Sequence, residues 1–256
     1  MEIQSRRKFI KGAALTGVAT CFIPNMETFA TIRGKEQRPK LKNGAVVLFQ
    51  GDSITDGNRG RDKDPNHIMG HGYAFSIASR LGADYPEKNY QFFNRGISGD
   101  KVIDLEKRWQ TDTLDLKPDV LSILIGVNDA TSVATGWEPV VSARIFETIY
   151  DKMLKQTRLA FPEIIFVLGE PFILKGSRVN DNWEAFCSDI SQRQAIVRKL
   201  ATKYNAVFVG FQEIFNKACK NAPIEYWIWD GIHPTVAGHE LMVREWIKQV
   251  EKRISF

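Results

Sequence analysis

The chain contains 256 residues, of which 43% are hydrophobic and 25% charged, a composition typical of a soluble globular protein that can bury a core. Its net charge of +5 falls to +3 when residues 1–30 are set aside, because 31 basic and 28 acidic residues then remain. So small an excess favours no nucleic-acid partner. Beyond residue 30 the cysteines are Cys187 and Cys219, with no CxxC motif, so a structural zinc site and a disulfide framework are disfavoured. The two thiols can stay separate or form a single bridge.

The first thirty residues are typical of an export signal. Arg6 and Arg7 stand in the run SRRKFIK, which has the pattern of a twin-arginine signal, and an apolar stretch follows over residues 12–23. That stretch is too short for a lasting transmembrane helix. We therefore predict cleavage after Ala30, export to the periplasm or the extracellular space, and no stable membrane insertion once the signal is removed.

Two further segments complete the predicted organisation. Residues 31–43 are charged and lack periodicity, so we expect a flexible leader, and residues 44–256 form one predicted domain. An alternative anchors the exported protein as a lipoprotein through Cys21, although Thr20 occupies a position where a smaller residue is usual.

Apolar, β-rich runs alternate with longer amphipathic patterns along this domain. Buried strands are predicted at 45–50, 90–94, 119–126, 163–170 and 205–210. Helices are predicted at about 73–82, 101–109, 140–160, 183–203 and 235–253. Because strand and helix alternate five times, we expect an α/β fold with a central parallel sheet of about five strands and helices on both faces.

Unusual residues follow these predicted strands, where the ligand sites of open α/β sheets lie. Ser53 stands in GDS after the first strand, and Gly99 ends the block NRGISG after the second. Asn128 stands in GVND after the third strand, and Asp230 and His233 share the block DGIH before the last helix. A hydroxyl, a base with a nearby carboxylate, and loops rich in glycine and amide groups are the components of an acyl-transfer site.

These four blocks, in this order, resemble the SGNH hydrolase superfamily, also called the GDSL esterases, from about residue 45 to the C-terminus. The resemblance implies a flavodoxin-like, three-layer α/β sandwich over residues 44–256. It also implies a serine esterase that needs neither a cofactor nor a metal. An α/β-hydrolase is disfavoured because the motif G-x-S-x-G is absent.

The chemistry of the residues agrees with the roles that the resemblance implies. Ser53 is the expected nucleophile, His233 the base that activates it, and Asp230 the carboxylate that orients the imidazole. The expected oxyanion hole consists of the backbone N–H groups of Ser53 and Gly99 and the side-chain amide of Asn128. Taken alone, Ser53 could equally be a helix-capping serine, and the other blocks decide against that reading.

Other polar residues near the blocks have less specific interpretations. Asp52 and Asp129 are expected to brace their loops by accepting backbone N–H bonds. A metal site at His67 and His71 is disfavoured, because nearby glycines and a proline oppose a helix and no third ligand is evident. His239 falls in the last helical pattern and is expected at the surface or in packing. A possible substrate rim, suited to stacking on a sugar, consists of His71, Trp137, Trp183 and Trp229.

The sequence therefore predicts an exported serine esterase that removes short acyl groups, chiefly acetyl, from a small-molecule or oligosaccharide ester. One alternative is a lipid-directed esterase, such as a lysophospholipase or thioesterase, which would need a long apolar channel. Another is a catalytically weak, carbohydrate-binding surface protein, which the retention of all four blocks disfavours. The oligomeric state is not determined by the sequence.

Overall fold

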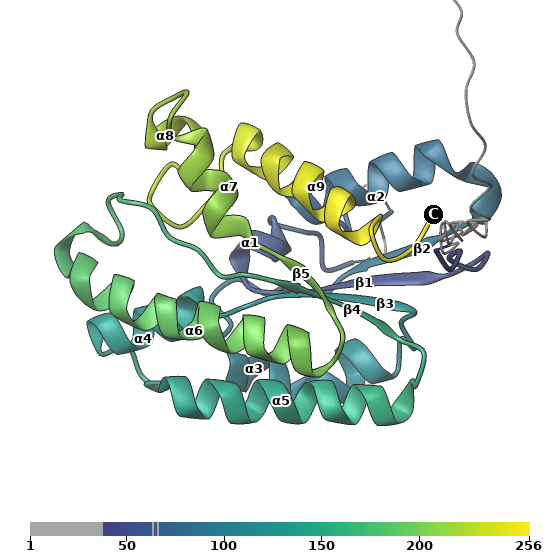
Figure 1. The fold of residues 1–256 in the computed structure, drawn as a ribbon, viewed down its shortest axis with the longest axis horizontal. Coiled ribbons are helices and arrows are strands. Elements are labelled where there is room, and N and C mark those ends of the chain that lie inside the picture. The colour runs from purple at the N-terminus through teal and green to yellow at the C-terminus, as the bar shows by residue number, and fades with distance from the viewer. Residues whose placement is uncertain (1–37, 63, 66) are drawn as a thin grey trace, which may run out of the picture. The chain divides into compact units, whose positions relative to one another are not determined.

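Five parallel strands in the order β2-β1-β3-β4-β5 form the sheet of the computed structural model, which describes residues 38–62, 64–65 and 67–256 (Figure 1). All five strands are short, and most of their residues are apolar and buried, as expected for a sheet covered on both faces, except in the edge strand β2, where only Asn94 is buried. The strands are β1 (Val46–Gly51), β2 (Gln91–Asn94), β3 (Val120–Leu124), β4 (Ile165–Gly169) and β5 (Val207–Val209).

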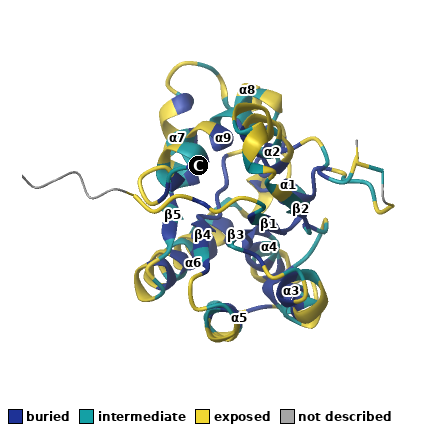
Figure 2. Ribbon diagram, turned by 90° about the vertical axis from the view of Figure 1, so that its right-hand side faces the viewer, coloured by how far each residue is buried: buried dark blue, intermediate teal, exposed yellow. Residues whose placement is uncertain are grey.

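Two layers of helices cover the sheet, and the strands lie buried between them in the end-on view of Figure 2. Helices α2, α7 and α9 lie on one face, and α3, α5 and α6 on the other (Figure 1). The helices are α1 (Ser53–Asp56), α2 (Tyr73–Asp84), α3 (Val102–Lys107), α4 (Val127–Thr135), α5 (Ala143–Ala160), α6 (Trp183–Lys203), α7 (Phe211–Ala218), α8 (Ile224–Trp227) and α9 (Val236–Val250). Short 3₁₀ turns lie at Pro86–Lys88 and Asn180–Asn182, and a π-helical turn at Gln110–Leu114.

The strand order is that of the flavodoxin-like fold, so the predicted fold class is confirmed. In this order the chain leaves β1 towards β2 on one side and later returns to β3 on the other. Such a reversal opens a crevice at the carboxyl ends of β1 and β3. These ends lie side by side, with Gly51 paired to Leu124.

Most predicted elements agree with the structure, but the predicted ranges leave out helices α1, α4, α7 and α8, of which α1 and α8 have four residues each. Helix α4 follows β3 directly and contains mainly small and polar residues, which hide its apolar period. Helix α7 has 8 residues, and its apolar residues Phe211, Ile214, Phe215 and Ala218 follow the helical spacing i, i+3, i+4 and i+7, a signal that the predicted ranges left out. The helix predicted at 101–109 ends at Lys107, and the π-helical turn continues the chain.

The predicted signal, residues 1–30, and the start of the expected leader lie outside the described residues. Within the described part of that leader, Lys40 pairs with Ser255 at the C-terminus, and Leu41 is buried in the core. The packed part of the chain therefore begins before residue 44, because the apolar side chain of Leu41 has a place in the core. No described helix combines the length and the apolar character that a membrane crossing requires.

Candidate active site

The turn after β1 presents Ser53 with its hydroxyl free of local bonds. A Cβ atom at Gly51 would lie 2.3 Å from the carbonyl oxygen of Leu124, so the turn accepts only glycine. The carboxylate of Asp52 caps α1 by accepting the N–H of Ile54 at 3.0 Å. The capping role that could have fallen to Ser53 therefore belongs to Asp52, and Ser53 is the first residue of the helix.

A chain of hydrogen bonds joins Ser53, His233 and Asp230. The Oγ atom of Ser53 lies 2.8 Å from Nε2 of His233, and Nδ1 of His233 lies 2.7 Å from Oδ2 of Asp230. The other carboxylate oxygen of Asp230 accepts the N–H groups of Ile232 at 3.0 Å and of His233 at 2.8 Å. Because an ionised carboxylate only accepts, Nδ1 carries the proton and Nε2 is free to accept one from Ser53.

The electrostatics of this chain favour an ionised Asp230. Burial alone would raise the pKa of Asp230, but the hydrogen bonds from the His233 side chain and from two backbone N–H groups lower it to about 2. His239 is different: burial, with His71 and His233 nearby, lowers its pKa to about 4. Its Nδ1 atom accepts the N–H of Tyr73 at 3.1 Å, so His239 is a neutral residue of α9 that packs against the start of α2.

The loop after β2 lies against the turn that carries Ser53. The N–H of Ile97 donates to the carbonyl of Gly51 at 3.0 Å, and the N–H of Ser98 donates to the carboxylate of Asp56 at 2.9 Å. Gly99 then takes a φ of +90°, a conformation that favours glycine. Among the described residues, neither the N–H of Ser53 nor that of Gly99 has a hydrogen-bond partner. Both donors are therefore available to a ligand.

Asp56 holds this loop in place, which the sequence did not reveal. Its buried carboxylate forms an ion pair of 2.6 Å with Arg61. Burial alone would raise the pKa of Asp56, but bonds from Arg61 and from the backbone N–H groups of Ser98 and Arg59 lower it. Asp56 is the last residue of the short helix α1, and its partner Ser98 lies 42 positions away, so no local pattern indicates the contact.

Asn128 reaches the same loop from the start of α4. One hydrogen of its side-chain amide is donated to the carbonyl of Asp100 at 3.0 Å, and the second hydrogen remains available. Its neighbour Asp129 is buried and accepts the N–H of Val102 at 3.0 Å. Burial raises the pKa of Asp129 to about 7 and that of Asp52 to the same value. The second carboxylate oxygen of Asp52 has no hydrogen-bond partner among the described residues.

Two of the four predicted rim residues lie beside the proposed catalytic residues: Trp229 next to His233, and Trp137 next to Gly99. The ring of Trp229 stacks on that of His233, with 6.0 Å between centroids and 26° between planes, and the side chain is 58% exposed. Trp137 stands next to Gly99, because a Cβ atom built on Gly99 would lie 4.0 Å from its ring. The Nζ atom of Lys101 lies 4.1 Å from the centroid of the Trp137 ring.

Among the described residues, the side chains of the other two predicted rim residues, Trp183 and His71, form no hydrogen bond, ion pair or ring contact with Ser53, His233 or Gly99. Trp183 begins α6, packs on the core and has Lys175 5.9 Å from its ring centroid. His71 is exposed, and its backbone N–H donates to the carbonyl of Gly57 at 2.9 Å. His67 pairs instead with Asp64. No group of three potential ligands for a metal ion occurs within the described ranges.

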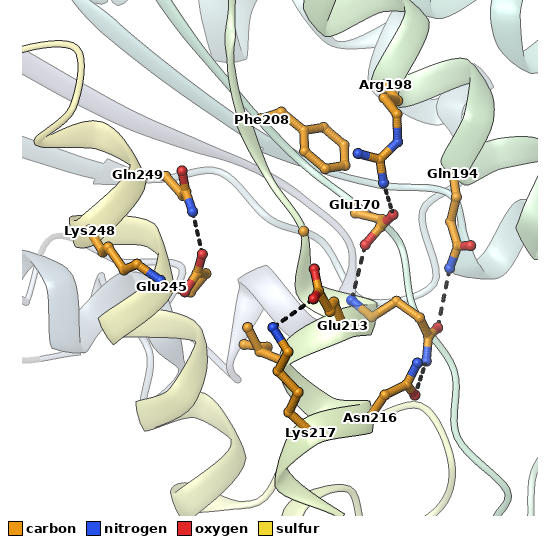
Figure 3. A pocket seen from close by; sticks show the side chains of 13 residues that line it. Glu170, Gln194, Arg198, Phe208, Glu213, Asn216, Lys217, Glu245, Lys248 and Gln249 are labelled. Carbon is orange, nitrogen blue, oxygen red and sulfur yellow. Dashed lines mark hydrogen bonds and ion pairs between the residues drawn. The ribbon is translucent and has the colours of Figure 1, made fainter.

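A polar cavity of about 530 Å³ lies elsewhere, between α6, α7 and α9 (Figure 3). Its charged side chains pair with one another: Glu170 with Arg198, Glu213 with Lys217, and Glu245 with Lys248. Since neither Ser53 nor His233 lines it, this cavity is separate from the candidate site.

Several known proteins resemble this chain in sequence and in structure. The profile of the GDSL-like lipase/acylhydrolase family matches residues 49–241. An acetylxylan esterase from Geobacillus stearothermophilus is 31% identical over 220 residues, which cover 82% of this chain and 96% of that protein. The solved structure of a protein from Parabacteroides merdae described as a GDSL-like lipase has a TM-score of 0.78 and 37% identity, and the match covers 84% of this chain and 99% of that one.

Several solved structures belong to the Geobacillus esterase itself, each with a TM-score of 0.73 and 82% of this chain covered. Three of them are described as catalytic mutants, in which alanine replaces a serine, an aspartate or a histidine. The family profile and this relative span most of the described domain. The chain therefore belongs to the GDSL-like lipase/acylhydrolase family, within the SGNH superfamily that its four blocks resemble, and is a carboxylic-ester hydrolase.

Proposed function

We propose that this hydrolase is an exported serine esterase that removes acetyl groups from carbohydrate. The observation that carries the proposal is the hydrogen-bonded chain from Ser53 through His233 to Asp230. Next to it are the backbone N–H groups of Ser53 and Gly99, which have no partner in the described part of the chain. A serine hydroxyl needs a base within hydrogen-bond reach, and an oxyanion needs donors that are already in place.

The reaction then follows from these positions. Ser53 Oγ attacks the ester carbonyl carbon while His233 Nε2 takes the hydroxyl proton, and Asp230 stabilises the imidazolium. The N–H groups of Ser53 and Gly99 and the free amide hydrogen of Asn128 donate to the carbonyl oxygen as it becomes negative. His233 returns the proton to the leaving alcohol. Water, activated by the same imidazole, releases the acid and restores Ser53.

The relative's catalytic mutants support this assignment of roles. In the Geobacillus esterase the replaced aspartate and histidine stand three positions apart, as Asp230 and His233 do here. The replaced serine precedes that histidine by nearly the same distance in sequence as the 180 positions between Ser53 and His233. A tryptophan directly before the aspartate was also varied in that esterase, at the place that Trp229 takes here.

The surroundings of Ser53 support a short acyl group and a sugar. The ring of Trp137 stands next to Gly99, one of the proposed oxyanion donors, where it would contact the acyl group. Trp229 presents a half-exposed ring parallel to His233, where the leaving alcohol would lie, and sugar rings stack on such surfaces. The Geobacillus relative is an acetylxylan esterase and is also described as an acetyl-xylooligosaccharide esterase, which agrees with this substrate class.

Export is proposed from the sequence of the first thirty residues, with its twin-arginine pattern. Replacing Arg6 and Arg7 together by lysine should retain the full-length precursor inside the cell. Fractionation followed by immunoblotting measures this. Unchanged export of the variant would exclude the twin-arginine route.

Two substrate assays test the catalytic proposal. Nitrophenyl esters from acetate to palmitate measure the preferred acyl length, and acetate release from acetylated xylan and pectin measures action on carbohydrate. Ser53→Ala should abolish both activities, whereas Ser191→Ala, which removes an exposed hydroxyl on α6, should leave them intact. Full activity in Ser53→Ala would contradict the proposed nucleophile. Rapid hydrolysis of long chains alone would favour a lipid-directed esterase instead.

A further inference from the structure

The loop that follows β4 lies against the segment carrying Asp230 and His233. The N–H of Leu174 donates to the carbonyl of Gly231 at 2.9 Å, and the N–H of Arg178 donates to the carbonyl of Asp230 at 3.0 Å. At Gly176 the two backbones approach so closely that a Cβ atom would lie 2.3 Å from the carbonyl carbon of Asp230. This loop therefore has a fixed position relative to the proposed catalytic carboxylate.

The same loop brings a cation to that carboxylate. The Nε atom of Arg178 lies 2.7 Å from Oδ2 of Asp230, the oxygen that also accepts the Nδ1 proton of His233. The side chain of Asp230 is fully buried, whereas that of Arg178 is 59% exposed. One carboxylate oxygen is thus shared between a permanent cation and the imidazole.

We propose that Arg178 is a positioning residue of this hydrolase, which holds the Asp230 carboxylate in place and draws away part of its negative charge, so that His233 remains neutral to lower pH. The proposal rests on the catalytic roles proposed above for Asp230 and His233. A general base must be unprotonated to act, so a cation behind its carboxylate partner extends the active range towards acid. The ion pair also restricts the carboxylate to the rotamer that faces the imidazole.

Other charged or titratable groups also lie near His233, and the effect of Arg178 adds to theirs. Asp230 contacts Nδ1 of His233 directly, at 2.7 Å. Asp52 is close enough for its charge to interact with His233 from the turn after β1, and His239 is close enough from α9. Arg178 differs from these groups because it acts on the shared carboxylate oxygen.

Proton uptake by His233 can be measured without relying on activity. In the mature protein labelled with ¹³C-histidine, the His233 resonance is assigned with His233→Gln and followed over pH. Arg178→Gln should raise the pH of half-protonation by about half a pH unit, a modest shift because the guanidinium is partly exposed to solvent. The acidic limb of kcat/KM for nitrophenyl acetate should move upward by the same amount, since that limb reports the free enzyme's base.

Matched variants separate charge from loop structure. Lys175→Gln removes a charge from the same loop, but its Nζ atom lies by Trp183, so the His233 titration should not move. Arg178→Lys retains the charge and should shift the titration by less than half as much as Arg178→Gln. Arg178→Ala is a second neutral variant if Arg178→Gln does not fold.

Two results would overturn the proposal. One is an unchanged His233 titration in the neutral Arg178 variant, with activity reduced equally at every pH, because that pattern indicates only a structural loop contact. The other is an equal shift in Lys175→Gln. If Ser53→Ala keeps full activity, the catalytic roles fail, while the His233 titration still reports whether Arg178 controls its protonation.

Discussion

At the scale of single residues, Asn128 has two amide hydrogens with separate tasks. One is donated to the carbonyl of Asp100, which fixes the side chain, and the other is free for the proposed oxyanion. Removing one donor from an oxyanion hole costs about 3 kcal/mol of transition-state stabilisation. We therefore expect Asn128→Ala to lower kcat about 10²- to 10³-fold with little change in KM, measured with nitrophenyl acetate.

The control for this prediction is Asn216→Ala, in the separate polar cavity, which should keep kcat within twofold. A rise in KM with an unchanged kcat for Asn128→Ala would contradict the oxyanion role, because that pattern indicates a donor used equally in the ground state.

The sequence alone indicated the proposed roles of those residues that lie in short sequence blocks. Ser53, Gly99 and Asn128 each follow a strand, and Asp230 and His233 share one short segment. The contacts of Asp56 and Arg178 could not be read in that way. Asp56 contacts Ser98 across 42 positions, and Arg178 contacts Asp230 from another loop, so no local spacing indicates either pair.

At the scale of elements, the junction between β1 and α1 depends on a glycine. A methyl group at Gly51 would collide with the carbonyl oxygen of Leu124 on the neighbouring strand, which cannot move without breaking the sheet. We expect Gly51→Ala to destabilise the fold by about 3 kcal/mol or more, and urea unfolding followed by circular dichroism measures this.

Gly136→Ala serves as the comparison. Gly136 has a φ of +73°, and no atom of the described residues lies within 4 Å of a Cβ atom built there. The expected cost is therefore that of a left-handed alanine, about 1–2 kcal/mol. Equal destabilisation by both substitutions would show that crowding at Gly51 is not the cause.

Strands β1, β3, β4 and β5 were predictable because each is a buried apolar run, which few other structures produce. The edge strand β2 is only partly buried, and its aromatic residues, which favour strands, made it predictable. The strand ends lie within about two residues of those predicted for most strands. Helix α4 was not predictable, since a short helix of small and polar residues is stabilised by its neighbours and has little periodicity of its own. Helix α7, in contrast, carries apolar residues at helical spacing and could have been predicted.

At the scale of the whole molecule, the buried carboxyl of Asp52 links stability to pH. Burial raises its pKa from an ordinary value of 3.8 to about 7 in the folded state, so the folded protein binds more protons than the unfolded chain between these values. The stabilisation is complete below about pH 4 and is lost as the pH rises through about 7. As the pH rises from about 4 to about 7, the free energy of unfolding of the wild type should therefore fall by roughly a few kcal/mol relative to that of Asp52→Asn.

Chemical denaturation at several pH values measures this difference. The control is Asp84→Asn, which changes an exposed carboxylate at the end of α2. Its free energy of unfolding should change with pH in the same way as that of the wild type. If the free energy of unfolding of Asp52→Asn also follows that of the wild type, the Asp52 carboxyl is ionised in the folded protein, and the proposed link between its protonation and stability is wrong. Asp230 has the opposite sign: its pKa of about 2 stabilises the fold above about pH 4, and this is lost as the pH falls through about 2.

The sequence by itself determined the alternation of strands and helices, and it indicated the order of the four blocks. Both are local properties of the chain, set by apolar periodicity and by short runs of residues. Tertiary structure alone decided that Asp52 rather than Ser53 caps α1, that Trp137 and Trp229 flank the site while Trp183 packs on the core, and that Arg178 reaches Asp230. These contacts join residues distant in sequence, and only the folding of the chain around the carboxyl ends of β1 and β3 brings them together.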